Sequence, residues 1–224
     1  MRRLIVFAKE PRPGHVKTRL AAFVGPEPAA RLYRAFLEDL AAVFASLRGT
    51  RVEWWVDGRP GAMGFLRGPW GRPYRQGAGD LGERLARAFR SAFHRGGGPV
   101  AVVGTDCPLL EAAHLHELFD ALAQGAEASV LPAEDGGYAA LGLAAPCPAV
   151  FRDIPWSTAS VLAHTLDVLE GEGRRVQVLP AVYDVDDRRD LERLTRDLAA
   201  RPGRAPSTAR TLTRLAAAPP AGGP

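Results

Sequence analysis

The first apolar run of the sequence ends in a loop that carries four cationic side chains. Residues 4–8 have the composition of a buried strand, and the loop after them contains Gly14, two prolines and the cations Lys9, Arg12, Lys17 and Arg19. Backbone N–H groups and the positive end of a following helix favour an anion at such a position, and cationic side chains neutralise it. The loop therefore predicts a phosphate site, with a solvated basic turn as the alternative.

Aspartates at two later positions have the chemistry of metal ligands. Asp106 lies just beyond the apolar strand predicted at 99–103, where a carboxylate can bind a divalent cation whose shell is completed by diphosphate oxygens. Asp184 and Asp186 lie on the same side of an extended segment, because alternate residues of a strand face the same way. Helix capping or a turn is the alternative for each of them. Together the two acidic sites predict one Mg²⁺ or Mn²⁺ ion between them.

A glycine-rich turn precedes a helix in the middle of the chain. It runs from Gln76 through Gly79 to Asp80, and its glycines let the backbone approach a ligand closely. An exposed Gln76 amide would suit the edge of a base or a sugar, so these three residues are candidates for nucleotide contact. A plain loop leading into a capped helix is the alternative, because Asp80 and Glu83 have the spacing of a capping box.

A second turn, at 132–138, and a later helix start offer groups for a hydroxylated substrate. Two adjacent glycines allow close approach of the backbone, and an acidic and a phenolic side chain can hydrogen-bond hydroxyl groups. Before the later helix, an indole provides a platform for a sugar or a base. The candidate substrate contacts are Asp135, Gly136, Gly137, Tyr138, Trp156 and Ser157. A simple turn and a helix N-cap at Ser157 are the structural alternatives.

Strands and helices alternate along the chain. After the first strand, composition predicts strands at 51–56, 99–103, 128–131, 138–143 and 175–179, and helical spacing predicts helices at 29–47, 80–94, 112–123, 157–169 and 187–199. This alternation predicts an α/β, three-layer fold with a mainly parallel mixed sheet and helices on both faces. In such sheets ligands bind at the carboxyl ends of the strands, where the candidate residues fall.

The composition is that of a soluble globular protein. The 224 residues, 46% hydrophobic and 24% charged with a net charge of +4, predict one domain at 1–200 and a Pro/Ala/Gly-rich tail at 201–224 with room for one short helix. No stretch reaches about 18 apolar residues, and no signal peptide is indicated. Cys107 and Cys147 lack metal-ligand spacing, which favours a cytoplasmic protein. No basic arm marks a nucleic-acid binder.

Six sequence motifs follow one another from about residue 3 to residue 195. They are FAKEPRPGHVKTRL, QGAGDLGERL, VVGTDCPLL, PAEDGGYAALGL, PWSTASVL and YDVDDRRDL. In this order they resemble the radical-SAM/selenodomain-associated transferases, a bacterial glycosyltransferase-like family long catalogued as a domain of unknown function. The resemblance implies a GT-A-like nucleotide-diphospho-sugar transferase fold. It also implies a relation to the nucleotidyltransferases that make molybdopterin dinucleotides and activate phospholactate with guanosine.

The resemblance also implies roles for individual residues. The phosphate-facing loop is matched by Lys9, Lys17 and Arg19, and the acceptor region by Asp135 and Tyr138. Asp106 matches the aspartate that serves as metal ligand, in a Gly-Thr-Asp context rather than Asp-x-Asp. Asp184 or Asp186 matches the second acid near the metal. The chain departs from the family at Asp187, where threonine is usual, so the acid that faces the metal is left open.

Two reactions suit this machinery. In glycosyl transfer the acceptor attacks the anomeric carbon of a nucleotide sugar and a nucleoside diphosphate leaves; in nucleotidyl transfer it attacks the α-phosphorus of a nucleoside triphosphate and pyrophosphate leaves. In both, a cation at Asp106 together with Lys17 and Arg19 would offset the charge of the leaving group, which makes these three residues the candidate catalytic groups. The family name places glycosyl transfer ahead.

Other classes of protein fit less well. The first loop lacks both GxGxxG and GxxxxGK[ST], which argues against a dinucleotide oxidoreductase and a P-loop kinase or ATPase. A non-catalytic nucleotide-sugar binding protein is an alternative, although its acidic sites would not need to be intact. The base, the sugar, the acceptor and the oligomeric state stay open.

Overall fold

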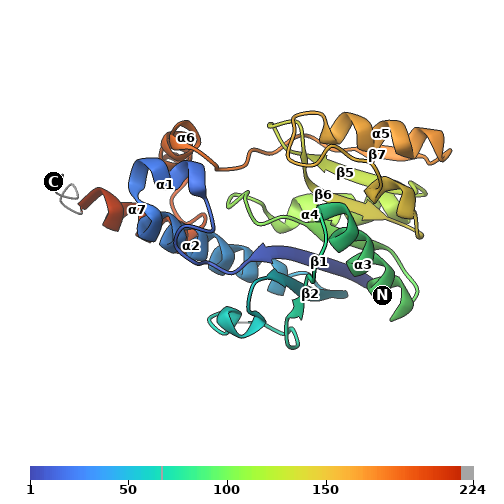
Figure 1. Cartoon of the computed structure of the whole chain (residues 1–224), viewed down its shortest axis with the longest axis horizontal. Helices are drawn as coiled ribbons and strands as arrows, with labels where there is room; N and C mark the ends of the chain where they lie inside the picture. The colour runs from blue at the N-terminus through green and yellow to red at the C-terminus, as the bar shows by residue number, and fades with distance from the viewer. Residues whose placement is uncertain (67, 218–224) are drawn as a thin grey trace.

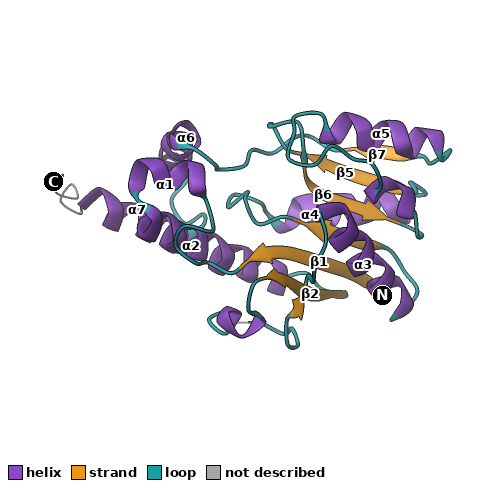
Figure 2. Cartoon of the chain, viewed as in Figure 1, coloured by secondary structure: helices purple, strands orange, loops and turns teal. Residues whose placement is uncertain are grey.

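A computed structural model describes residues 1–66 and 68–217, so the last part of the predicted tail, 218–224, lies outside the described residues. The central sheet has seven strands in the order β3-β2-β1-β4-β6-β5-β7. Helices pack on both faces of this sheet (Figure 1, Figure 2). The predicted α/β fold with a mainly parallel mixed sheet is confirmed.

The first strand of the chain lies in the interior of the sheet. β1 (Arg2–Lys9) pairs in parallel with β2 (Thr50–Asp57) on one side and with β4 (Val100–Val103) on the other. Beyond β2, the two-residue strand β3 (Tyr74–Arg75) forms one edge. Because parallel neighbours end at the same side of a sheet, the loops after β1, β2 and β4 emerge together.

The second half of the sheet brings two more segments to that side. β6 (Tyr138–Leu143) runs antiparallel between β4 and β5 (Ala128–Pro132), and β7 (Val176–Val178) pairs in parallel with β5 at the other edge. The turn between β5 and β6 therefore reaches the side where β4 ends. A parallel bridge between Ala133 and Val182 adds the segment that leads to Asp184 and Asp186.

Apolar stripes determine which face of the sheet each helix covers. The alternation along β1 points Leu4 and Val6 toward the face covered by α2, α4 and α6, and Ile5 toward the face covered by α3 and α5. The helices are α1 (Thr18–Val24), α2 (Pro26–Ala45), α3 (Leu81–His94), α4 (Ala112–Ala123), α5 (Val161–Gly171), α6 (Arg188–Ala200) and α7 (Pro206–Ala217), with 3₁₀ turns η1 (Pro60–Met63) and η2 (Pro148–Phe151). In Figure 1, α1, α6 and α7 gather at the end toward which β1 runs.

Two predicted helix starts are wrong. The helix predicted from residue 29 begins at Pro26, because Gly25 adopts φ 87° and separates it from α1, and proline suits a first helical turn. The helix predicted from Ser157 begins at Val161. Ser157 has φ 65° and is not its N-cap, because the Thr158 hydroxyl instead donates to the carbonyl of Pro155 at 2.7 Å and closes a separate turn.

The helix in the predicted tail, α7, packs against α2. Its first turn is held by Asp39 of α2, which is 6% exposed and accepts from the backbone N–H groups of Ser207 at 2.9 Å and Thr208 at 2.8 Å. Just before α7, Arg204 donates to the carbonyl of Leu109 at 2.8 Å and so supports the loop after Asp106. None of the helices within 1–66 and 68–217 is long and apolar enough to cross a membrane.

Candidate functional site

Lys17 lies between two carboxylates at the side of the sheet where β1 and β4 end. Its Nζ donates to Asp106, which follows β4, and to Asp186, at 2.9 Å, in the segment before α6. Arg19, in the first turn of α1, donates to the other oxygen of Asp186 at 2.6 Å. We call these four residues the lysine–carboxylate cluster. The structure thus brings together two of the residues predicted as phosphate ligands, Lys17 and Arg19, and two of those predicted as metal ligands, Asp106 and Asp186.

The local backbone aims the Lys17 side chain inward. Lys17 directly precedes α1 with φ 48° and ψ 47°, in the left-handed region that residues other than glycine rarely adopt. Its side chain is 3% exposed, and Nζ lies 5.9 and 5.7 Å from the ring centroids of Tyr33 and Phe36 in α2. The ammonium is stable there because two carboxylates pair with it and the aromatic faces attract it.

Tyr33 also connects the two strand ends that frame the site. Its hydroxyl accepts from the backbone N–H of Lys9 at 3.0 Å and shares a hydrogen bond of 2.8 Å with the hydroxyl of Thr105. Burial, and then the charge of Asp106, raises the pKa of Tyr33 to about 12. Sequence reasoning missed Tyr33 and Thr105, because helical spacing shows that Tyr33 is interior but not that its hydroxyl reaches the sheet.

Opposite charges keep the cluster ionised. Burial by itself would lower the pKa of Lys17, but Asp106 and Asp186 together raise it. Burial would likewise raise the pKa of Asp186, and Lys17 and Arg19 outweigh it, so that the pKa is lowered. Two cations therefore face two carboxylates in this cluster.

Asp184 and Asp135 form an acidic group beside the cluster. Burial, and then the negative charge of Asp135, raises the pKa of Asp184 to about 6, and the charge of Asp186 adds to this. Asp184 comes from the segment before α6 and Asp135 from the turn after β5. The structure therefore places a predicted substrate residue beside a predicted metal ligand.

The acidic residues supply suitable oxygen ligands but are not arranged as a preformed metal centre. Within the described ranges, no group of three or more metal-ligating side chains is assembled. Asp106 and Asp186 converge on the Lys17 ammonium instead. Carboxylate oxygens are nevertheless the ligands that Mg²⁺ and Mn²⁺ prefer, and the Asp106 side chain is 54% exposed. The donor set therefore fits a divalent cation that brings further oxygen ligands with it, and the metal roles of Asp106, Asp184 and Asp186 remain predictions.

An ion pair holds the start of the loop predicted to bind phosphate. Glu10 accepts from the Arg59 guanidinium at 2.6 Å and from the Arg59 backbone N–H at 2.8 Å, which lowers the pKa of Glu10 to about 2. Gly58 permits this contact, since a Cβ there would lie 2.6 Å from the Cβ of Glu10. Lys9 is exposed, and Gly14 turns the loop with φ 77°. Arg59 thus neutralises Glu10, which is the one acidic side chain of this basic loop.

The Gln76 amide is buried, not exposed as predicted. Its Nε2 donates to the carbonyls of Ala8 at 3.2 Å and Trp55 at 3.1 Å, and so links β1 to β2. Its backbone N–H donates to Val56 at 3.1 Å, which extends the pairing of β3 and turns the side chain into the sheet. Its amide hydrogens are therefore used in hydrogen bonds within the sheet and not in contact with a nucleotide.

Asp80 acts as the N-cap of α3. Its carboxylate accepts from the backbone N–H of Glu83 at 2.8 Å, and the Glu83 carboxylate accepts from the N–H of Asp80 at 3.0 Å, which completes the capping box. Gly79 has φ 105°, and its carbonyl accepts from Arg84 at 2.8 Å. The carboxylates of Asp80 and Glu83 at this helix N-terminus would repel the phosphate groups of a nucleotide. Asp80 is therefore a helix cap, which was the alternative to nucleotide contact.

Packing requires one of the two glycines in the turn between β5 and β6. Gly136 has φ 89°, and a Cβ on it would lie 2.1 Å from the carbonyl oxygen of Ala159. Its own carbonyl accepts from the N–H of Leu162 at 2.9 Å, and the N–H of Gly137 donates to the carboxylate of Asp135 at 2.8 Å. The close approach to Gly136 that was predicted for a ligand is thus made by the backbone of Ala159.

Trp156 packs against Tyr138 and the start of α3. The two ring centroids are 6.4 Å apart in an edge-to-face arrangement, and Gly82 leaves room for the indole, because a Cβ there would lie 2.7 Å from Trp156 Nε1. The Tyr138 hydroxyl is buried without a partner among the described residues, and burial raises its pKa. Ser157 is exposed beside this pair. The turn from Asp135 to Tyr138 thus connects the aromatic pair to the acidic group.

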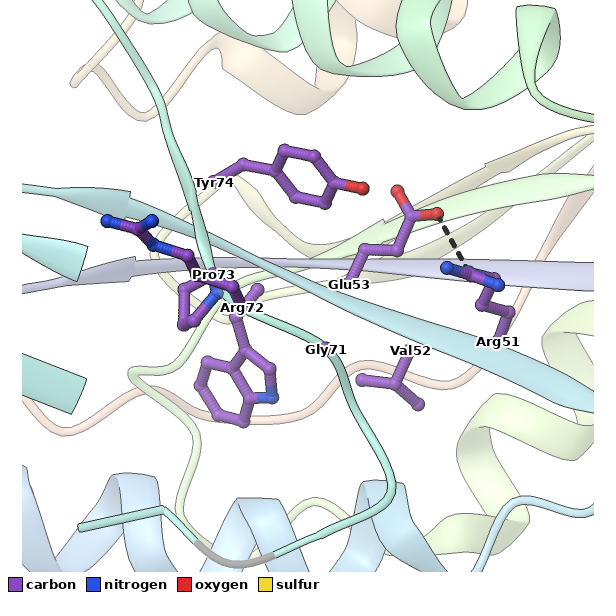
Figure 3. Close-up of a pocket in the computed structure, with 8 residues that line it drawn as sticks. Arg51, Val52, Glu53, Gly71, Arg72, Pro73 and Tyr74 are labelled. Atoms are coloured by element: carbon purple, nitrogen blue, oxygen red, sulfur yellow. Dashed lines mark ion pairs between the residues drawn. The ribbon is translucent and has the colours of Figure 1, made fainter. Parts of the chain in front are cut away.

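Two cavities lie away from these residues. One, of about 380 Å³, lies between β2 and the segment entering β3 (Figure 3), and the other, of about 370 Å³, lies along 60–73. The first is lined by Tyr74 and by Glu53, whose buried carboxylate pairs with Arg3 at 2.8 Å, with Arg51 at 3.5 Å and with Arg95. No predicted site residue lines either cavity. The candidate site is therefore separate from both of these cavities.

Comparisons with known proteins agree with this fold. The profile of a family described as "Uncharacterized protein conserved in bacteria (DUF2064)" matches residues 40–158. A solved structure from Desulfovibrio desulfuricans G20, provisionally named a nucleotide-diphospho-sugar transferase, is 33% identical with a TM-score of 0.89 over 96% of this chain and 95% of that chain. No functionally curated protein gives a significant match.

More distant solved structures share the fold. A nucleotidyl transferase from Methanothermobacter is 19% identical with a TM-score of 0.58 over 89% of this chain and 98% of that one. A cytidylyltransferase from Leptospira borgpetersenii is 12% identical with a TM-score of 0.57 over 96% and 94%. Identities this low carry only the fold. The family profile covers more than half of the chain and the Desulfovibrio structure nearly all of it, so the chain belongs to the bacterial family DUF2064.

Proposed function

We propose that this protein is a transferase that uses a nucleotide-activated donor and passes the glycosyl group of a nucleotide sugar to a small acceptor. The lysine–carboxylate cluster carries the proposal, because cations and carboxylates from three chain segments meet at the ligand-binding side of the parallel strands. The name of the 33% identical relative supports it. The narrower placement among the radical-SAM/selenodomain-associated transferases rests on the six motifs and is part of this proposal.

The residues of the cluster would stabilise the departing diphosphate. Lys17 and Arg19 donate charge-assisted hydrogen bonds to its oxygens, and exposed Lys9 approaches from the same loop. Asp106 and Asp186, with Asp184 beside them, would hold Mg²⁺ or Mn²⁺. When bound, such a cation neutralises the charge that develops on the leaving group.

The second group of residues would contact the rest of the substrates. Asp135 and the backbone of the turn after β5 bind hydroxyl groups of the acceptor. The aromatic pair of Tyr138 and Trp156 provides an apolar surface with a polar edge beside them. The turn containing Gly79 contributes backbone groups to the nucleotide.

A thermal-shift panel of nucleotides tests the proposal. The ligands are UDP, GDP, CDP, dTDP and ADP, the matching triphosphates and several nucleotide sugars, each with and without Mn²⁺. A ligand at 100 times its Kd stabilises by about 2.7 kcal/mol, which is a Tm shift of about 5–10 °C for a chain of this size. We expect a Mn²⁺-dependent shift with one diphosphate or its sugar conjugate. A preference for a triphosphate would indicate nucleotidyl transfer instead.

Two matched variants test whether the Mn²⁺-dependent thermal shift arises at the lysine–carboxylate cluster. Asp106→Asn removes a charge from the cluster, and Asp167→Asn removes one from the exposed face of α5. We expect the first to abolish the Mn²⁺-dependent shift and the second to leave it unchanged. An unchanged shift in Asp106→Asn, or no shift with any ligand of the panel, would contradict the proposed function.

A further inference from the structure

Lys17 is one of only two lysines in the chain. The sequence contains 27 arginines, whereas its lysines are Lys9 and Lys17, both at the end of β1 and in the loop after it. Cations elsewhere in the protein are arginines, including the three around the buried Glu53. An ammonium is a compact point charge, and a guanidinium is a broad planar group. The position between Asp106 and Asp186 is therefore filled by the side chain whose charge most resembles that of a metal ion.

Lys17 and Arg19 together engage both carboxylates of the cluster. One oxygen of Asp106 and one of Asp186 accept from Nζ, and the second oxygen of Asp186 accepts from Arg19. The Lys17 side chain is 3% exposed, whereas Asp106 is 54% exposed, so the ammonium is shielded from water and the outer carboxylate is not. The four formal charges cancel.

A bare divalent cation gains little from Asp106 and Asp186 while Lys17 and Arg19 offset their charge, even though Asp184 and Asp135 lie beside them. To reach both carboxylates it would have to separate them from Lys17, and the ammonium would then be buried without a partner, which is strongly unfavourable. A cation that arrives with a diphosphate brings negative oxygens of its own. Lys17 and Arg19 can pair with these oxygens while the carboxylates pair with the cation.

We propose that Lys17 is the resident cation of the Asp106–Asp186 pair and makes divalent-ion binding conditional on a diphosphate group. This inference rests on the proposed function for the identity of that group. Without diphosphate the cluster excludes the ion. With diphosphate, Lys17 exchanges its carboxylate partners for phosphate oxygens, and Asp106 and Asp186 would then be free to hold the ion.

Binding of Mn²⁺ alone, followed by the loss of its free-ion EPR signal, tests the exclusion. We expect no saturable binding by the wild-type protein. Lys17→Met leaves the two carboxylates in excess and should bind Mn²⁺ at least about tenfold more tightly. Lys17→Arg is the matched control that keeps the charge, and it should exclude the ion as the wild type does. Adding Asp106→Asn to Lys17→Met should abolish the gained binding.

Arg19→Met provides a second route if Lys17→Met does not fold. Arg19 is 68% exposed, and its loss also leaves the cluster with excess negative charge. We expect a smaller gain in Mn²⁺ affinity in this variant. Arg31→Met, on the exposed face of α2, should show none. Saturable Mn²⁺ binding by the wild type, equal binding by Lys17→Met and Lys17→Arg, or no gain in any cluster variant would overturn the exclusion.

Equilibrium dialysis of inorganic diphosphate tests the second half of the inference. With Mg²⁺ present, the wild type should retain diphosphate, and Lys17→Met should retain at least about tenfold less. Equal retention by the two proteins would overturn the proposed exchange of partners. If the wild type retains neither diphosphate nor any nucleotide, the proposed function fails, whereas the exclusion of the bare ion is judged on the Mn²⁺ titrations alone.

The exchange also has a spectroscopic signature. Protein labelled with ¹⁵N-lysine contains only two Nζ signals, and that of Lys17 is identified by its absence in Lys17→Arg. We expect Mg²⁺ alone to leave this signal in place and Mg²⁺ with diphosphate to shift it. A shift with Mg²⁺ alone would contradict the inference.

Discussion

Asp184 is a half-buried carboxylate whose neighbours include two other aspartates, and this makes stability depend on pH. Its folded pKa of about 6 lies above its ordinary value of 3.8, so the folded state holds this proton at pH values where the unfolded state has lost it. Stability therefore falls as pH rises from about 4 to 6, and the loss is complete above that range. Partial exposure limits the loss to about 1–2 kcal/mol.

Asp184→Asn should remove this dependence. The variant cannot ionise at this position, so we expect it to be more stable than the wild type at pH 7 and equal to it near pH 4. Thermal melts between pH 4 and pH 7 in a chelating buffer measure the difference, with Asp167→Asn as the control. A difference in Tm that stays constant across this range would show that Asp184 is ionised throughout.

The types of the site residues could be read from the sequence, but their partners could not. Lys17, Arg19, Asp106 and Asp186 were predicted as phosphate and metal ligands from their places at strand ends, and they do lie together. The pairing of Lys17 with aspartates 89 and 169 residues away has no local signal. The burial of Gln76 depends on pairing between β2 and β3, which is equally invisible to spacing.

Among the elements, the start of α3 allows a test of whether Asp80 caps the helix or contacts the nucleotide. Asp80 was predicted to contact nucleotide, and it caps α3. Asp80→Ala should destabilise the protein by about 1 kcal/mol, because it leaves a first-turn N–H without its acceptor. Asp80→Asn keeps a cap and should cost only a few tenths of a kcal/mol. Denaturant unfolding measures both.

The same variants examine nucleotide binding. If Asp80 acts only as a cap, the ligand-induced Tm shift should be the same in the wild type, Asp80→Ala and Asp80→Asn. A shift that is lost in both variants, with folding intact, would restore Asp80 to the nucleotide site.

Elements with strong periodicity could be predicted, whereas those created by tertiary contacts could not. The stripes of α3 and α4 gave their bounds closely, as did the capping box at Asp80 and Glu83. β3 has only two residues and exists because it pairs with β2. The turn around Ser157 depends on hydroxyl contacts of Thr158 and on the backbone of Gly136 packing against Ala159, which a serine before an apolar stripe does not reveal.

At the scale of the whole molecule, α7 is fastened to the body of the protein by a buried charge. Asp39→Ala removes the acceptor of two backbone N–H groups in a site that is 6% exposed. Hydrogen bonds to charged groups contribute about 1.5–3 kcal/mol, so we expect a loss of about 2–3 kcal/mol. Glu38→Ala, at the neighbouring half-exposed position of α2 where the carboxylate pairs with Arg34 at 3.1 Å, should cost about 0.5 kcal/mol or less. Chemical denaturation compares the two, and equal losses would show that Asp39 does not anchor α7.

The sheet as a whole illustrates the limit of local reasoning. Alternating elements predict helices on both faces of a mainly parallel mixed sheet, and such a sheet forms. The position of β1 in the interior, with β6 antiparallel between β4 and β5, follows from contacts between segments that lie far apart in the chain. No pattern within β1 or β6 specifies these neighbours.

The anchoring of α7 by Asp39 has a consequence for synthesis on the ribosome. The N–H groups that Asp39 needs belong to residues 168 and 169 positions later in the chain. Synthesis proceeds at about 5–20 residues per second. The Asp39 carboxylate of a newly made α2 therefore lacks its hydrogen-bond donors for roughly 10–30 s. During that interval this face of α2 would be accessible to chaperones and proteases, and slow codons in the segment that encodes α7 would lengthen the exposure. Variants that weaken α7 should therefore lower the yield of folded protein in cells more than their equilibrium stability alone would indicate.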